Sequence, residues 1–135
     1  MSKNVEILIV EGNPNESEHL KNILEQHDYC VSVATGGGAA LDSVSRQKPR
    51  IVISALVLPE MDGYELCHAI KADEQLKDIS VILLTSLSDT TDLIRGVECG
   101  ADNFVTDPFD EKLLISFREI RRLFESVRRD FWRKL

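Results

Sequence analysis

Short apolar runs alternate with longer amphipathic stretches along this chain. The runs cover residues 5–10, 30–34, 51–54, 81–85 and 104–105. Three of them, 5–10, 51–54 and 81–85, are nearly continuous in apolar residues, which is typical of strands buried on both faces of a sheet. Because each run is followed by a segment with helical spacing, the pattern predicts an α/β fold with a doubly wound, five-stranded parallel sheet and helices on both faces.

Helix start and stop signals fall between these runs. Asn13 is suited to cap a first helix, and Pro14 occupies the first helical position, where its missing N–H is harmless. Gly100 suits a left-handed residue that ends the fourth helix. The predicted helices run from 13 to about 26, from 36–38 through 44, from just after 63 through 70, and from 89–92 to 100.

The last predicted helix starts near Asp110 and is longer than one domain needs. Its apolar residues follow a 4-3-4-3-4 spacing, which is a heptad seam. We therefore expect a compact domain over residues 3–124 and, over residues 125–135, a helical extension or linker toward a further domain or a dimer partner. The alternative is a frayed amphipathic tail. The seam consists of Leu113, Phe117, Ile120, Phe124, Val127 and Phe131.

Charge is unevenly distributed over the 135 residues, a length that suits one domain. Residues 1–109 hold 8 Lys and Arg against 18 Asp and Glu, whereas residues 110–135 hold 8 against 5. An acidic body argues against direct binding of nucleic acid by this domain. No apolar leader is present and no segment reaches the roughly 20 apolar residues of a membrane span, so we expect a cytoplasmic domain without membrane contact.

Cysteine and histidine give no sign of a metal site. The three cysteines are odd in number and lack CxxC spacing, so buried or partly buried free thiols are expected. No histidine has a second ligand at metal spacing, and surface positions are expected for all of them. These residues are Cys30, Cys67, Cys99, His19, His27 and His68.

Several segments, in this order, carry a resemblance to a known family. They are ILIV at 7–10, LPEMDGYE at 58–65, LLTS at 83–86, and GAD at 100–102 followed by PF at 108–109. Together they resemble the receiver domains of two-component response regulators, over nearly the whole chain. The resemblance implies a flavodoxin-like (βα)5 fold with strand order 2-1-3-4-5 and, in this chain, an extended last helix.

In that family an acidic pair follows the first strand, an Asp ends the third, a Thr or Ser ends the fourth, and a Lys precedes a Pro after the fifth. Carboxylates at these positions hold Mg²⁺ and accept a phosphoryl group. The matching residues here form a degenerate phosphorylation pocket of Glu11, Gly12, Ala55, Thr85 and Asp107. The methyl group of Ala55 cannot attack phosphorus, and Gly12 offers no metal ligand.

The Lys position holds Asp107, whose charge has the wrong sign. A carboxylate about 4 Å from an incoming negative charge costs on the order of 4 kcal/mol at an effective dielectric near 20. Ser54 is not expected to replace the acceptor, because neighbouring strand side chains point to opposite faces. We therefore predict no catalytic residues, no cofactor, and lost or weak Mg²⁺ binding.

The resemblance also implies a switch and interaction face containing Thr85, Phe104 and Pro108, with a cis peptide before Pro108. It implies a phosphorylation-independent signalling module that acts through protein–protein interaction in a two-component or phosphorelay system. Its partners would be signalling proteins or adjacent domains of the same polypeptide, with a possible homodimer through the last helix. Phe104 is open to a second interpretation, as a core residue.

Two alternatives compete with this hypothesis. One is a conventional phosphoacceptor receiver whose acceptor site is altered or engineered at Ala55. The other is an enzyme with its site at the carboxyl ends of the strands. The sequence does not favour an enzyme, because those ends hold no nucleophile–base pair and no Gly-rich phosphate loop follows the first strand.

Overall fold

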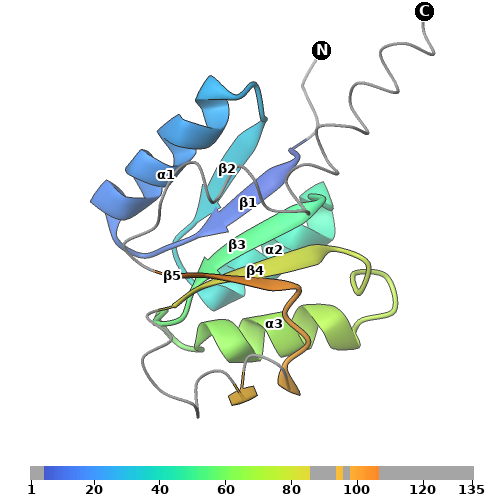
Figure 1. The fold of residues 1–135 in the computed structure, drawn as a ribbon. Helices are drawn as coiled ribbons and strands as arrows, with labels where there is room; N and C mark the ends of the chain where they lie inside the picture. Colours follow the sequence, from blue (N-terminus) through green and yellow to red (C-terminus); the bar gives the residue numbers. More distant parts are fainter. Residues whose placement is uncertain (1–4, 86–93, 96–97, 107–135) are drawn as a thin grey trace, which may run out of the picture.

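The computed structural model describes residues 5–85, 94–95 and 98–106 (Figure 1). The predicted last helix, its heptad seam and the peptide before Pro108 lie outside these residues. So do Asp107 and the predicted start of the fourth helix.

The core of the fold is the predicted five-stranded parallel sheet, and its order, β2-β1-β3-β4-β5, is the one that the resemblance to receiver domains implied. Its strands differ from the predicted runs by at most two residues at either end. They are β1 (Ile7–Val10), β2 (Val31–Ala34), β3 (Ile51–Ala55), β4 (Ser80–Thr85) and β5 (Asn103–Thr106). Because β1, β3 and β4 lie in the interior of the sheet, their apolar runs pair on both sides.

Helices cover both faces of the sheet. Figure 1 shows α1 (Pro14–Gln26) on one face and α2 (Gly37–Gln47) and α3 (Gly63–Ala72) on the other. The predicted cap is confirmed, since the Oδ1 of Asn13 accepts hydrogen bonds from the backbone N–H of Asn15 at 2.9 Å and of Glu16 at 3.3 Å. Gly100 has φ +86°, the left-handed conformation expected of it.

The apolar side chains form one core on each face because strand side chains alternate. Ile7 and Ile9 pack with Leu20 and Leu24 of α1, whereas Leu8 belongs to the second core together with buried side chains of α2 and α3. Every residue of β1 is fully buried. This two-sided packing fixes the sheet and therefore the positions at which its strands end. Within the described residues no helix has the length and low polarity needed to cross a bilayer.

Candidate functional site

Four residues of the predicted degenerate pocket lie at the carboxyl edge of the sheet. Glu11 and Gly12 follow β1, Ala55 is the last residue of β3, and Thr85 is the last of β4. In the sheet register Ala55 pairs with Leu84, so the ends of β3 and β4 differ by one residue. The topology therefore brings together positions that are 30 to 74 residues apart in the sequence.

The remaining pocket residue, Asp107, lies outside the described residues. The nearest described position is Thr106, which ends β5 and pairs with Thr85. This register places the exit of β5 beside the end of β4. Pro108, which belongs to the predicted interaction face, also lies outside the described part of the chain.

The carboxylate of Glu11 turns toward the start of α1. Its side chain is buried, and its Oε1 accepts a hydrogen bond from the backbone N–H of Asn13 at 3.0 Å. Gly12 beside it is exposed. A Cβ built on Gly12 would lie 3.4 Å from the Thr35 carbonyl oxygen and 3.9 Å from Cδ of Pro59, which are ordinary contacts. An Asp at this position would therefore meet no obstacle at its Cβ.

Ala55 presents only a methyl group at the end of β3, with 8% of its surface exposed. Ser54 is fully buried, as expected, and its hydroxyl donates a hydrogen bond to the Ala55 carbonyl at 2.9 Å. Because the two side chains point to opposite faces of the sheet, Ser54 does not substitute for an acceptor at position 55.

The loop from β3 to α3 closes directly against Ala55. The backbone N–H of Gly63 donates to the Leu56 carbonyl at 2.8 Å. A Cβ on Gly63 would lie 2.4 Å from the Ala55 carbonyl oxygen, so only glycine fits there without a shift. Asp62 then caps α3, since its Oδ1 accepts the backbone N–H of Glu65 at 2.8 Å. This cap was not among the sequence predictions, although the Asp-x-x-Glu pattern at 62–65 signals it.

Arg95 is a second residue that sequence reasoning missed. Its Nη2 lies 3.0 Å from Oδ2 of Asp62, and its guanidinium carbon lies 4.4 Å from the centre of the Tyr64 ring. The contact joins the segment before β5 to the start of α3. No local sequence pattern reports it, because the partners are about 30 residues apart and meet only in the folded chain.

The described edge of the sheet offers few ligands for a Mg²⁺ ion. Magnesium requires near-octahedral oxygen coordination, usually with more than one protein carboxylate or substrate oxygen. Glu11 provides the only carboxylate among the described strand-end positions of the pocket, since Gly12 and Ala55 carry no side-chain oxygen. Nowhere in residues 5–85, 94–95 and 98–106 do three His, Cys, Asp or Glu side chains gather as a metal site.

Phe104 is partly buried and packs against the core on the α2 and α3 face. Its ring therefore contacts the core, as the second interpretation expects, while its place in the switch and interaction face stays a prediction. The cysteine prediction is confirmed, with Cys67 and Cys99 buried and Cys30 partly buried, all as free thiols. The three histidines are exposed, also as expected.

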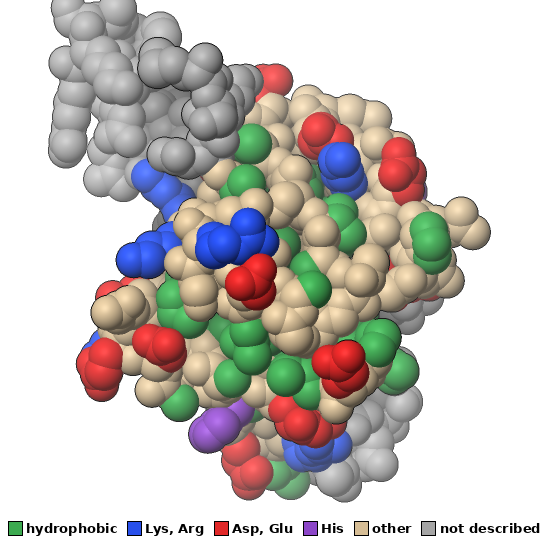
Figure 2. Space-filling model, turned by 180° about the vertical axis from the view of Figure 1, so that it is seen from behind, with side chains coloured by type: hydrophobic (Ala, Val, Ile, Leu, Met, Phe, Trp, Pro, Cys, Tyr) green, Lys and Arg blue, Asp and Glu red, His purple; other side chains and the backbone are tan. Residues whose placement is uncertain are grey.

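Exposed large apolar side chains are scattered over the described part of the chain. Figure 2 shows acidic side chains spread over one face of the molecule, with apolar side chains in separate small patches. The large apolar residues that are exposed lie on different elements: Val33 on β2, Val57 in the loop after β3, and Ile94 in the segment before β5.

Comparisons with known proteins agree on one family. The family model described as "Response regulator receiver domain" matches residues 7–118. Histidine kinase P4 of Formosa agariphila is 41% identical over 106 residues, which are 78% of this chain and 8% of that protein. The DNA-binding response regulator MtrA of Mycolicibacterium smegmatis is 34% identical over 82% of this chain and 47% of its own length. The chain thus spans less than half the length of either relative.

Solved structures give the same result. The signal receiver domain of a histidine kinase from Syntrophus aciditrophicus is 45% identical, with a TM-score of 0.83 over 92% of both chains. The receiver domain of sensor histidine kinase PA1611 from Pseudomonas aeruginosa, with a magnesium ion in its active site cleft, is 27% identical, with a TM-score of 0.79 over 90% of this chain and 98% of that one. Sheet order, strand-end positions and these matches together show that the chain belongs to the response regulator receiver domain family.

Proposed function

We propose that this receiver domain signals without accepting a phosphoryl group, and that it acts through protein–protein contacts in a two-component or phosphorelay system. One observation carries the proposal: the position at the end of β3 that aligns with the family's phosphoacceptor holds Ala55, whose exposed surface is a methyl group. A methyl group has no lone pair with which to attack phosphorus, so no nucleophilic step is available there.

The surroundings of Ala55 support the proposal. Glu11 is the one acidic residue left of the pair after β1, and its Oε1 is bound to the Asn13 N–H at the start of α1. Gly12 has no side-chain oxygen that could bind a metal ion. Asp107, where the family has a lysine, would add negative charge where a phosphoryl group carries its own. The pocket therefore lacks its nucleophile, and its metal binding and charge neutralisation are weakened as well.

Incubation with acetyl phosphate and Mg²⁺, followed by intact-mass measurement, tests the proposal. We expect no mass gain for the natural chain. The matched positive control is the triple variant Gly12→Asp, Ala55→Asp, Asp107→Lys, which should gain one phosphoryl group. A stoichiometric, acid-stable or acid-labile adduct on the natural chain would end the proposal.

The alternative function is a conventional phosphoacceptor receiver in which Ala55 is an altered or engineered position. The single variant Ala55→Asp separates the two. If phosphorylation failed only because of Ala55, this variant would become phosphorylated efficiently. We expect it to remain inefficient, because Gly12 and Asp107 still weaken the metal site and the charge balance.

We further propose that the domain lies in the cytoplasm and that its partners are signalling proteins or other domains of the same polypeptide. The relatives named above are a histidine kinase and a DNA-binding regulator, both longer than this chain.

The heptad seam suggests a dimer through the last helix. Truncation after Glu125 should leave a folded monomer by sedimentation, whereas an unchanged dimer would place the interface elsewhere.

A further inference from the structure

Arg95 lies where two structural elements meet. Its guanidinium pairs with Oδ2 of Asp62 at 3.0 Å and covers the Tyr64 ring at 4.4 Å. About half of the Arg95 side chain is exposed, compared with 31% for the Asp62 side chain. The Arg95 carbonyl also accepts the backbone N–H of Cys99 at 3.0 Å. The two side-chain contacts thus hold Arg95 against the first residues of α3.

The residues that Arg95 contacts are themselves fastened to the candidate site. Asp62 uses its other oxygen to cap α3. Gly63, between Asp62 and Tyr64, packs on the Ala55 carbonyl and donates to the Leu56 carbonyl at 2.8 Å. A continuous series of direct contacts therefore runs from the end of β3, through the Asp62–Tyr64 turn, to Arg95.

The segment that Arg95 holds leads straight into β5. From Arg95 the chain passes through Cys99 and the left-handed Gly100 to Asp102, whose backbone N–H donates to the Val81 carbonyl at 2.9 Å. Arg95 therefore belongs to the segment that enters β5, one of the strands whose carboxyl end faces the site.

We infer that Arg95 is a positioning residue that couples the carboxyl end of β3 to the segment before β5. The coupling rests on the proposed function in one respect: it gives a receiver without an acceptor a physical route between its strand-end site and a neighbouring surface. The route needs no phosphoryl group. A partner that moves the β3–α3 loop would move Arg95 and, with it, the described residues 98–102 that lead into β5.

Amide hydrogen exchange of the whole chain tests the first half of the inference. We expect Arg95→Ala to raise exchange at Cys99 and Asp102 about three- to tenfold, which is the size expected for losing one exposed ion pair and one cation–π contact. Arg95→Lys keeps the charge but loses the planar stacking, so its exchange rates at Cys99 and Asp102 should lie between those of the natural chain and of Arg95→Ala. Exchange in β1 should not change. Arg46→Ala is the matched control, because the contact that Arg46 makes among the described residues is an exposed ion pair with Asp42 within α2.

A double-mutant comparison tests the coupling itself. Ala55→Asp should change exchange at Cys99 and Asp102 when Arg95 is present, and should leave both amides unchanged in the Arg95→Ala background. A merely structural role would give the same effect of Ala55→Asp in both backgrounds, and that result would overturn the inference. Equal exchange in natural and Arg95→Ala chains would do so as well. Because no phosphate donor is used, these outcomes are independent of the acetyl phosphate experiment.

Discussion

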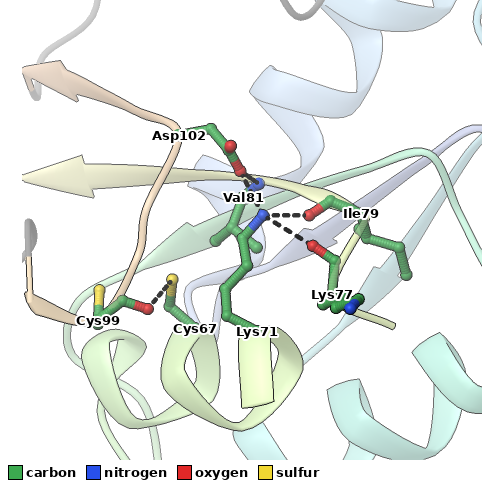
Figure 3. Close-up of polar contacts among 7 residues, drawn as sticks. All are labelled: Cys67, Lys71, Lys77, Ile79, Val81, Cys99 and Asp102. Carbon is green, nitrogen blue, oxygen red and sulfur yellow. Dashed lines mark hydrogen bonds and ion pairs between the residues drawn. The ribbon is translucent and has the colours of Figure 1, made fainter. Parts of the chain in front are cut away.

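The ammonium group of Lys71 lies 2.7 Å from Oδ2 of Asp102, and the pair ties α3 to the start of two strands (Figure 3). The same carboxylate oxygen accepts the backbone N–H of Val81 at 2.7 Å, and Lys71 Nζ donates to the Ile79 carbonyl at 2.7 Å. The side chain of Lys71 is only 19% exposed. This cluster fastens the end of the sheet opposite to the candidate site.

Lys71→Met should lower the free energy of unfolding by about 1–3 kcal/mol, because it removes the cation that pairs with the Asp102 carboxylate and the donor to the Ile79 carbonyl, leaving Asp102 with the Val81 N–H. Methionine keeps most of the apolar stem, so packing is little changed. Chemical denaturation measures the effect.

Lys77→Met is the control for that measurement. Lys77 pairs with Glu74 at 3.0 Å, but their side chains are 49% and 87% exposed. Loss of this ion pair should lower the free energy of unfolding by less than about 0.5 kcal/mol. Equal effects of the two substitutions would show that the Lys71 cluster does not stabilise the fold beyond an ordinary surface ion pair.

Gly63→Ala should destabilise the domain by about 1–3 kcal/mol, since the added Cβ would lie 2.4 Å from the Ala55 carbonyl oxygen, a backbone atom with little freedom to move. Gly12→Ala is the matched control, with its nearest contact at 3.4 Å, and should change stability by less than about 1 kcal/mol. Thermal unfolding of both variants checks the prediction. Similar melting temperatures would mean that the loop moves freely at Gly63.

Burial raises the pKa of the Cys67 thiol above its ordinary value of 9.0, and the contact with Cys99 raises it further. The folded chain therefore keeps this proton at a pH where the unfolded chain releases it. The contribution of the neutral thiol to the free energy of unfolding is fully present below about pH 9. It falls as the pH rises above that value, by up to about 1.4 kcal/mol per pH unit. Denaturation between about pH 8 and pH 10 measures this slope.

The variant Cys67→Ala tests whether this pH dependence comes from Cys67. In this variant the free energy of unfolding should fall less steeply between about pH 8 and pH 10. Burial, and to a smaller extent the charge of Glu6, raises the pKa of Tyr29 above its ordinary value of 10.0. Tyr29 therefore lowers stability in the same way, but only at higher pH. An unchanged slope in the variant would mean that Cys67 ionises equally in both states.

Alkylation of the native chain should modify Cys30 well before Cys67 and Cys99. Cys30 is partly exposed, whereas Cys67 is fully buried and its thiol donates to the Cys99 carbonyl at 3.3 Å (Figure 3). Thiolates are the reactive form, and burial disfavours them. Peptide mapping after brief iodoacetamide treatment gives the order, and denaturant should remove the difference. Rapid labelling of Cys67 in the native chain would contradict the buried position.

The strands and the described helices were predictable because their causes are local, whereas the strand order came from the resemblance to receiver domains. Continuous apolar runs such as 51–54 specify strands buried on both faces, and Asn13 with Pro14 specifies where α1 begins. The residues at the strand ends, Glu11, Gly12 and Ala55, were also identified, because the match to the receiver motifs assigns them to one edge of the sheet.

Tertiary structure decided the contacts between segments that are far apart in sequence. The pairing of Lys71 with Asp102, the packing of Gly63 on the Ala55 carbonyl and the position of Arg95 over Tyr64 depend on how helices and loops are placed by the sheet. Periodicity and capping act over a few residues and cannot report such distances. The sequence by itself therefore determined which chemical groups stand at the strand ends, and only the fold decided which other residues fasten them in place.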